Sequence, residues 1–340
     1  MKISGILKRI ALAAMLAALA LSVCACGANR RSPDSPDSPD LGESFVMREV
    51  SPLSVEKGKI TDASGSEVVL RGVSTHGIAW FPQYVNANAF RSVKEAGGNA
   101  VRVAMYTDTD SGYLADPEGN TLLVRQAIED AKAMDMYVIV DWHILSDGDP
   151  NDHLSEAITF FDAVASEYAD CPNVIYEICN EPNGVGWDRI KTYAYAIVPV
   201  IRQYAPDALV IVGTPEYSYD LSAAMNDPLP MEGLLYAYHY YAGEKLSARE
   251  LELAAEKDFP VIVSEWGIGC GRDGEPALED GKRFIELMDR LGVSRCAWSL
   301  CNKDEVYSIL KPECEKLGGF GEEDLSETGK IVWESLGGGL

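Results

Sequence analysis

Eight short apolar runs, separated by stretches with helical periodicity, constrain this chain more than any other feature of its sequence. Each run has the length and residue types of a buried β-strand. The runs lie at residues 67–74, 99–106, 136–143, 173–180, 208–214, 234–241, 259–266 and 294–300. Between them, segments such as 122–135 and 154–169 carry apolar residues at three- and four-residue spacing, which is typical of helices. This alternation indicates parallel strands covered by helices.

Eight such units favour an α/β fold of the closed (β/α)8 type, the TIM barrel. An open doubly wound sheet is the alternative, but it would require a glycine-rich phosphate turn after the first strand. The sequence "RGVSTHG" at that place offers none. Upstream, turn residues at Lys57-Gly58 and Ser64-Gly65 predict a short N-terminal β-hairpin that closes the bottom of the barrel. Residues 327–336 predict the last helix, and no second domain is expected after it.

The first 25 residues have the order of a secretion signal, with three basic residues ahead of an apolar run. The run is too short to favour a permanent membrane span. It ends in Val23, Ala25 and Cys26, which resemble the box recognised in bacterial lipoprotein processing, so we expect cleavage after residue 25 and lipidation of Cys26. Cleavage before Cys24 is one alternative, and ordinary signal cleavage without lipidation is another.

Residues 26–46 contain a threefold Ser-Pro-Asp repeat with almost nothing to bury, which predicts an extended tether. The tether leads into a catalytic domain expected over residues 47–340. We therefore expect an extracellular protein on the bacterial cell surface, lipid-anchored or secreted, and monomeric. The membrane would be a partner only through the N-terminal lipid.

Acidic residues dominate the charge of the chain, which is -24. Removal of residues 1–25, with three basic residues and no acidic ones, gives -24 - 3 = -27. A surface of this charge repels nucleic acid and other anionic polymers, so we exclude nucleic acid as a partner. A neutral substrate is compatible with it.

Six cysteines remain after Cys26, and none of them forms a pair at zinc-ribbon spacing. Cys179 and Cys296 lie in apolar strand-like runs, where we expect them to be small buried hydrophobic residues. One disulfide remains possible in a secreted protein, and the sequence leaves its identity open.

Polar and aromatic residues gather at the C-terminal ends of the predicted strands, where active sites of barrel enzymes lie. Three of the four histidines of the chain are among them, which favours a functional set. These strand-end residues are His76, Trp80, Arg102, Tyr106, Asp141, Trp142, His143, Asn180, Glu181, His239, Tyr241, Glu265, Trp266 and Trp298. His153 lies in a loop, and we assign it no role.

Glu181 and Glu265 are the candidate catalytic pair, because the fourth and seventh strands face each other across an eight-stranded barrel. Glycoside hydrolysis needs one carboxyl group to protonate the leaving oxygen and another to attack the anomeric carbon or activate water, and a separation of about 5 to 5.5 Å indicates retention. Burial under aromatic rings would help Glu181 hold its proton, and Arg102 would keep Glu265 ionised. Tyr241 is placed to donate a hydrogen bond to Glu265, and Asn180 to hold a sugar hydroxyl.

The aromatic residues Trp80, Tyr106 and Trp298 have two interpretations. They are either core residues, the usual fate of such side chains, or flat surfaces on which pyranose rings stack. Because polar strand-end residues are expected nearby, we favour the second interpretation, a groove for a neutral polysaccharide.

A catalytic metal site is the alternative to paired carboxylates. Its ligand types are present in Asp141, His143, His239 and Glu265. No paired H-x-H and no strand-end lysine completes a binuclear set. We therefore expect no metal and no cofactor.

At these residues the sequence resembles glycoside hydrolase family 5, and in particular its bacterial subfamily 2 endoglucanases. The resemblance covers about residues 50–336 and rests on seven motifs in the order of the family. They are "RGVSTHGIAWFPQYVN", "NAVRVAMYT", "VIVDWHILSDGDPN", "VIYEICNEPNG", "YAYHYYAG", "VIVSEWG" and "AWSLCNKDE".

The resemblance implies a retaining double displacement without cofactor, with Glu181 as acid/base and Glu265 as nucleophile. It implies a shell around the cleaved sugar that consists of Arg102, His143, Asn180, His239 and Tyr241. It also implies that Trp298 floors the subsite of bond cleavage and that the glycone side is lined by His76, Trp80, Tyr106, Lys303 and Glu305. One departure concerns the aglycone side, where such enzymes often carry a Trp and this chain offers Tyr217 and Tyr219.

The predicted function is that of an endo-β-1,4-glucanase acting on a β-glucan polysaccharide or oligosaccharide. The alternative among enzymes is a β-glycanase of the same family that cleaves mannan, mixed-linkage glucan or xyloglucan. The alternative from another class is a surface glycan-binding lipoprotein without activity, against which the intact Glu181, Glu265 and Arg102 argue.

Overall fold

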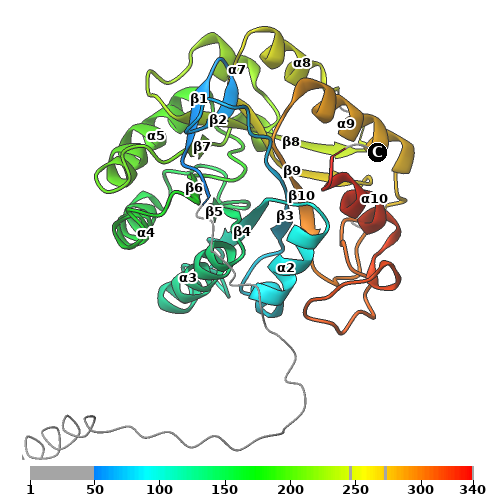
Figure 1. The fold of residues 1–340 in the computed structure, drawn as a ribbon. Coiled ribbons are helices and arrows are strands. Elements are labelled where there is room, and N and C mark those ends of the chain that lie inside the picture. The colour runs from blue at the N-terminus through cyan, green and yellow to red at the C-terminus, as the bar shows by residue number, and fades with distance from the viewer. Residues whose placement is uncertain (1–49, 245–246, 272–273, 339–340) are drawn as a thin grey trace, which may run out of the picture. The chain divides into compact units, whose positions relative to one another are not determined.

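The computed structural model of the chain describes residues 50–244, 247–271 and 274–338. Eight parallel strands form a closed barrel with helices around it, as the sequence predicts (Figure 1). Strand neighbours follow the order β10-β3-β4-β5-β6-β7-β8-β9, so each strand pairs with the next one along the chain. The barrel strands are β3 (Arg71–Thr75), β4 (Ala100–Tyr106), β5 (Tyr137–His143), β6 (Val174–Glu177), β7 (Val210–Val212), β8 (Leu234–Ala242), β9 (Val261–Ile268) and β10 (Arg295–Leu300).

Helices connect successive strands and cover the outside of the barrel. Local sequence sets several of their ends: the side chain of Asn86 caps the first of them, and Gly292, with φ 60°, ends the helix before β10. The α-helices are α2 (Ala87–Glu95), α3 (Pro117–Ala133), α4 (Leu154–Glu167), α5 (Trp187–Arg202), α6 (Pro215–Ser218), α7 (Ser222–Asn226), α8 (Arg249–Glu256), α9 (Leu278–Leu291) and α10 (Glu327–Ser335), and the short 3-10 helices are η1 (Pro82–Tyr84) and η2 (Glu322–Asp324).

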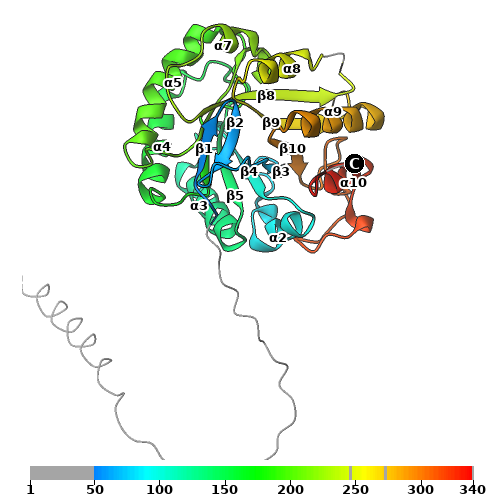
Figure 2. The same ribbon diagram turned by 45° about the horizontal axis from the view of Figure 1, so that its top comes forward.

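The predicted N-terminal hairpin is present as β1 (Leu53–Glu56) and β2 (Lys59–Asp62), which pair antiparallel. Its turn is made by Lys57 and Gly58, both with positive φ, as a two-residue hairpin turn requires. Leu53 and Ile60 pack into the apolar cluster at the N-terminal end of the barrel. Figure 2 shows the hairpin lying across that end, which confirms the expectation that it closes the bottom.

Side chains that point into the barrel form two layers of opposite character, because alternate residues of a strand face the same side. The lower layer is apolar and packs against the hairpin; it includes Ala100, Ile139, Ile175, Ile211, Ala237, Ile262 and Cys296. Two positions further along each strand, the upper layer is largely polar and consists of Arg102, Asp141, Glu177, Gly213, His239, Ser264 and Trp298. The apolar layer therefore supports a polar floor at the C-terminal end of the strands.

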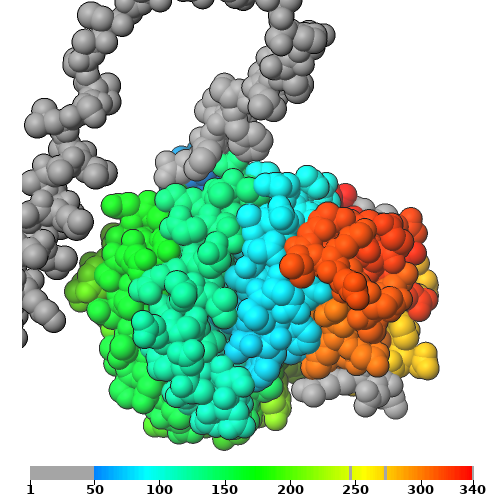
Figure 3. All heavy atoms as spheres, turned by 90° about the horizontal axis from the view of Figure 1, so that it is seen from below, coloured from blue at the N-terminus to red at the C-terminus, as the bar shows by residue number. Residues whose placement is uncertain are grey.

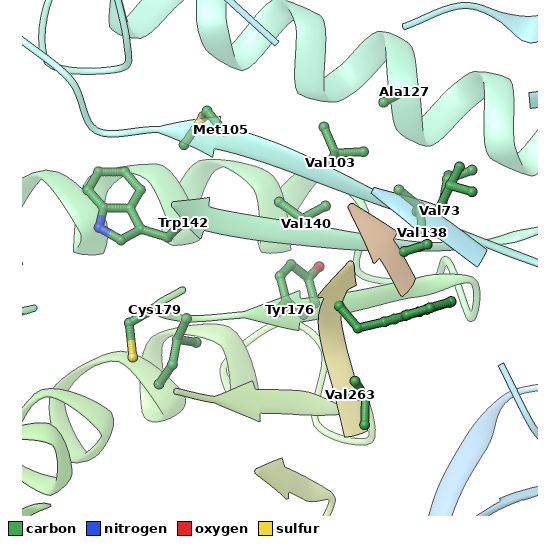
Figure 4. Packing of buried hydrophobic residues seen from close by; sticks show 14 of the residues in the cluster. Val73, Val103, Met105, Ala127, Val138, Val140, Trp142, Tyr176, Cys179 and Val263 are labelled. Atoms are coloured by element: carbon green, nitrogen blue, oxygen red, sulfur yellow. The ribbon is translucent and has the colours of Figure 1, made fainter. Parts of the chain in front are cut away.

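The larger apolar core lies between the barrel and its helices. Figure 4 shows outward-facing strand residues such as Val103, Val140 and Val263 in this core, with Ala127 contributed by α3. Closure of the barrel between β10 and β3 brings the two ends of the domain together. On the face in Figure 3, the cyan residues around α2 accordingly lie beside the orange and red residues near the C-terminus.

The predicted signal, the tether and Cys26 lie outside the described residues. Within the described ranges, no helix is long and apolar enough to cross a membrane. None of the six cysteines there is part of a disulfide, and Cys179 and Cys296 are buried, as expected from their apolar runs.

Candidate active site

Arg102 connects four strands at the polar floor of the barrel. Its Nε lies 2.6 Å from Oε2 of Glu177, its Nη1 lies 3.0 Å from Oε2 of Glu265, and its Nη2 lies 3.0 Å from Oδ2 of Asp141. Nη2 also donates to Oδ1 of Asn180 at 2.6 Å. The guanidinium is completely buried, and these carboxylates compensate for its lost hydration.

Both carboxylate oxygens of Glu265 accept hydrogen bonds. Arg102 donates to Oε2, and the hydroxyl of Tyr241 donates to Oε1 at 2.7 Å. Burial and the nearby Glu265 raise the pKa of Tyr241 well above its usual range, so the hydroxyl remains a donor. The expected contacts of Arg102 and Tyr241 with Glu265 are therefore present.

Glu181 contacts His239, a partner that the sequence did not predict, and it also interacts electrostatically with Tyr106 and Tyr241. His239 Nδ1 lies 2.9 Å from Oε1 of Glu181, and its Nε2 lies 3.0 Å from Oγ of Ser264. Burial disfavours the imidazolium of His239, but Glu177, Glu181 and Glu265 outweigh this effect and raise its pKa to about 9. A cationic donor thus stands beside Glu181 at neutral pH.

Glu181 and Glu265 are brought together, although 84 positions separate them in the sequence (265 - 181 = 84). A carboxylate oxygen of each, together with a ring nitrogen of His239, lies within 4.8 Å of the others. This spacing lies near the separation typical of retaining glycosidases and below that of inverting ones.

The contacts of these groups disfavour the alternative of a metal centre. Asp141 and His143 hold each other at 2.6 Å, and the Arg102 cation lies 3.0 Å from both Asp141 and Glu265. The His239 nitrogen that faces Glu181 is at hydrogen-bond distance from it, which places a proton between them. A further cation would be repelled by both the guanidinium and the imidazolium.

His143 has a fixed tautomer. Because Asn180 accepts from Arg102 through Oδ1, its amide nitrogen donates to the oxygen of Ile144 and to Nε2 of His143, at 3.1 and 3.2 Å. The His143 proton is therefore on Nδ1, facing Asp141. Burial and the nearby Arg102 lower the pKa of His143 to about 3, so the ring is neutral. Asp141 is thus the buried hydrogen-bond partner of the His143 ring.

A cavity of about 450 Å³ opens beside these groups, and five of the predicted glycone-side and sugar-shell residues line it: His76, Trp80, Tyr106, His143 and Lys303. The indole of Trp80 is 40% exposed and meets Tyr106 edge to face, with ring centroids 4.7 Å apart. An exposed indole next to a stack of rings suits the apolar face of a sugar. These residues are thus gathered as the sequence predicts.

Lys303, Glu305 and His76 form a connected group on the same side. Lys303 Nζ lies 2.8 Å from Glu305 and 3.2 Å from Nε2 of His76. Trp298 packs against His76 and His143, with centroid distances of 5.2 and 5.4 Å, and is only 7% exposed. Its indole is therefore part of the packed floor of the site and is not an exposed side wall.

The two tyrosines after β7 lie in different environments. Tyr219 donates its hydroxyl proton to the oxygen of Ser247 and packs on Tyr238, whereas Tyr217 is 52% exposed. Tyr217 has a left-handed backbone, with φ 61°, and its N–H donates to the oxygen of Pro182 at 3.0 Å. Tyr217 is therefore the exposed aromatic residue anchored to the segment that carries Glu181.

Two residues of the site, Glu177 and Ser264, were not predicted from the sequence. Glu177 is completely buried in β6, pairs with Arg102 and accepts a hydrogen bond from Ser264 at 2.7 Å. The signal was present, because a charged residue inside the apolar run "NVIYEICN" requires a buried partner.

Comparison with known proteins places these motifs among cellulases. The sequence profile of Cellulase (glycosyl hydrolase family 5) matches residues 61–304. Endoglucanase A of Butyrivibrio fibrisolvens is 42% identical over 300 residues, which cover 85% of this chain and 69% of that protein. Endoglucanase N of Pectobacterium atrosepticum is 41% identical over 293 residues, which cover 84% of this chain and 66% of that protein. The chain thus spans about two thirds of the length of these relatives.

Solved structures agree with the sequence relatives. The catalytic domain of Thermobifida fusca endoglucanase Cel5A, in complex with cellotetraose, has a TM-score of 0.79 and 33% identity, and the match covers 84% of this chain and 97% of that domain. The alkaline cellulase K catalytic domain has a TM-score of 0.77 and 30% identity, covering 87% of this chain and 98% of that domain.

Proposed function

Because the chain belongs to glycosyl hydrolase family 5, the cellulase family, we propose that it is an endo-β-1,4-glucanase with a retaining mechanism. The observation that carries this proposal is the approach of Glu181 and Glu265 within 4.8 Å, each with a different partner. At that distance one carboxylate can attack the anomeric carbon while the other reaches the leaving oxygen.

In the first step, Glu265 forms a bond to the anomeric carbon as the glycosidic bond breaks, and Glu181 gives its proton to the departing oxygen. Arg102 and Tyr241 hold the Glu265 carboxylate in position for the attack. His239 donates to Glu181 as it becomes negatively charged. The product is a glycosyl ester on Glu265 and a shortened glucan.

In the second step, Glu181 takes a proton from water while the water oxygen attacks the anomeric carbon. The ester bond to Glu265 breaks, and the carboxylate returns to Arg102 and Tyr241. Two inversions at one carbon give retention. This chemistry needs no cofactor, since the two carboxyl groups supply the nucleophile and all proton transfers.

Substrate class is proposed from the lining of the cavity and the charge of the chain. The Trp80 and Tyr106 rings beside the polar groups suit a pyranose chain, and the charge of -24 favours a neutral glucan. Relatives that are named endoglucanases and the cellotetraose complex of the Thermobifida enzyme support a β-1,4-glucan. We further propose that exposed Tyr217 contacts the leaving part of the chain.

A panel of substrates tests the proposal. The purified protein and its Glu265→Gln variant are incubated with carboxymethylcellulose, cello-oligosaccharides, barley glucan, xyloglucan and mannan. We expect internal cleavage of the β-1,4-glucans by the parent, and loss of turnover with retained oligosaccharide binding in the variant. Dominant cleavage of mannan would reject the glucanase assignment, and binding without turnover on every substrate would favour a glycan-binding lipoprotein.

We also propose that the protein is exported and anchored to the bacterial cell surface through a lipid on Cys26. Support comes from the basic and apolar order of residues 1–25 and from the Ser-Pro-Asp repeat that follows Cys26. Mass spectrometry of the mature N-terminus should find a lipid on Cys26. A free, unmodified N-terminus would reject the anchor.

A further inference from the structure

Three side chains form a continuous hydrogen-bonded path that leads to Glu181. Glu177 Oε1 accepts from Oγ of Ser264 at 2.7 Å, and the same hydroxyl lies 3.0 Å from Nε2 of His239. On the other side of the ring, Nδ1 lies 2.9 Å from Oε1 of Glu181. The path joins a carboxylate that has no access to solvent with the proposed catalytic acid.

Donor and acceptor roles along the path follow from Glu177. A carboxylate can only accept, so Ser264 directs its single proton to Glu177. The oxygen of Ser264 then has only lone pairs left for His239, and Nε2 must carry a proton. Nδ1 is consequently the nitrogen at which His239 gains or loses its second proton, and this nitrogen faces Glu181.

We propose that Glu177 is a positioning residue that acts through Ser264 to hold His239 as an imidazolium whose Nδ1–H points at Glu181. The proposal rests on the proposed function, in which Glu181 is the acid/base. In the first step Glu181 becomes a carboxylate, and an imidazolium donor stabilises that charge more than a neutral ring would.

The surroundings of His239 support a cationic ring. Charged and titratable groups face it from several strands: Glu177 at 3.9 Å in β6, Glu181 after β6, Glu265 in β9, and Asp141 and His143 in β5. Arg102, the cation of the same polar floor, is held by Glu177, Asp141 and Glu265. Carboxylates therefore outnumber cations around the ring, in agreement with its raised pKa of about 9.

Histidine side-chain NMR tests the proposal directly, since the chain has only four histidines. In the parent protein we expect the His239 ring to titrate near pH 9. In Glu177→Gln the midpoint should fall by one pH unit or more, because the carboxylate that favours the imidazolium is gone. In Ser264→Ala it should fall by less, because the Glu177 charge remains and only the hydrogen bond is lost.

The Ser264→Ala variant distinguishes this role from a purely structural one. Ser264 contacts Glu177 and His239, and its removal leaves the ion pair between Arg102 and Glu177 in place. Ser299→Ala is the matched control: Ser299 is equally buried, and its hydroxyl contacts Cys301 instead. The control should leave the His239 midpoint unchanged. An unchanged midpoint in both Glu177→Gln and Ser264→Ala would overturn the proposal.

The titration is independent of glycan cleavage, so its failure is distinguishable from failure of the proposed function. Kinetics provide a second readout on any glucan that the parent cleaves. We expect Ser264→Ala to lower kcat with little change in KM, because the lost effect belongs to the transition state. A rise in KM at constant kcat would contradict a role through Glu181.

Discussion

Individual residues in the polar floor are stabilised by specific partners rather than by solvent. Arg102 meets three carboxylates within 3.0 Å, and each of them has another donor or ring nitrogen nearby. Buried charges are tolerated only with such pairing, and removal of one partner leaves an uncompensated charge. Substitutions here should therefore have larger effects than similar substitutions at the surface.

Arg102→Lys keeps the charge but loses the planar fork that spans the carboxylates. We expect the free energy of unfolding to fall by about 2 kcal/mol or more and kcat to fall at least about 100-fold. Urea unfolding and initial rates measure the two effects. Arg125→Lys is the control, since its pair with Glu167 is exposed and contributes about 0 to 1 kcal/mol. Equal effects of the two substitutions would contradict this account.

Tyr241→Phe removes one hydroxyl from Glu265 without changing the size of the ring. The lost hydrogen bond should lower kcat about 10-fold, as expected for 1 to 2 kcal/mol at a charged acceptor. Tyr137→Phe removes a hydroxyl that donates to Ser51 at the opposite end of the barrel. It should leave the rate unchanged, and a matching loss in both variants would argue against a role for Tyr241 at Glu265.

Secondary-structure elements were the part of the molecule most accessible from sequence. All eight predicted strands and the hairpin are present, because alternation of apolar runs with helical periodicity has few other solutions. β6 is shorter than predicted and ends at Glu177, so Glu181 lies on the loop after it. That loop is held by tertiary hydrogen bonds, from the Asn180 N–H to Trp142 and from Ser218 to the oxygen of Asn180, which no local pattern reveals.

Side-chain partners were less accessible than strand positions. Arg102 and Tyr241 could be paired with Glu265 because strand ends converge at one end of a barrel. The contact between His239 and Glu181 depends on ring orientation, which Ser264 and Glu177 determine from below. Neither Ser264 nor Glu177 was predicted from the sequence, so the contact that they orient was not predicted either.

The close approach of β7 to the Glu181 loop predicts a sensitive glycine. A Cβ on Gly213 would lie 2.4 Å from the oxygen of Cys179 and 2.7 Å from Cδ of Pro182. Gly213→Ala should displace the loop, lower the free energy of unfolding by about 1 to 3 kcal/mol and reduce kcat. Gly337→Ala, whose nearest contact would be 3.7 Å away, is the control. Full activity in Gly213→Ala would show that the loop tolerates the shift.

For the molecule as a whole, buried titratable groups should determine how stability depends on pH. The pKa of His239 is raised from 6.5 to about 9, so its contribution is complete below pH 6.5 and is lost as pH rises through about 9. Burial raises the pKa of Glu177, but Arg102 and the hydrogen bonds to Glu177 outweigh this effect and lower the pKa from 4.5 to about 2. The contribution of Glu177 to the free energy of unfolding is therefore complete above pH 4.5 and is lost as pH falls through about 2.

His143, whose pKa is lowered to about 3, removes stability as pH falls below 6.5, so the three groups together predict greatest stability near pH 6.5. Urea unfolding at a series of pH values should show the decline on the alkaline side, and His239→Asn should reduce it. An equally steep alkaline decline in that variant would assign the effect to other groups.

The net charge of -24 predicts that salt changes the rate of hydrolysis of anionic substrates more than that of neutral substrates. Screening shortens the range of repulsion from about 30 Å at 0.01 M to about 8 Å at 0.15 M ionic strength. Hydrolysis of anionic carboxymethylcellulose should therefore rise over this range, while hydrolysis of neutral barley glucan should change little. A parallel response of both substrates would show that long-range charge is irrelevant to binding.

The stereochemistry of the first product is the sharpest test of the proposed mechanism, because it depends on the short separation of Glu181 and Glu265. Proton NMR of the parent protein with a cello-oligosaccharide, recorded before mutarotation, distinguishes the two anomers. We expect the β-anomer as the initial product of the parent protein and no product from Glu265→Gln. The α-anomer as the initial product would contradict the proposed mechanism, because water rather than Glu265 would then attack the sugar.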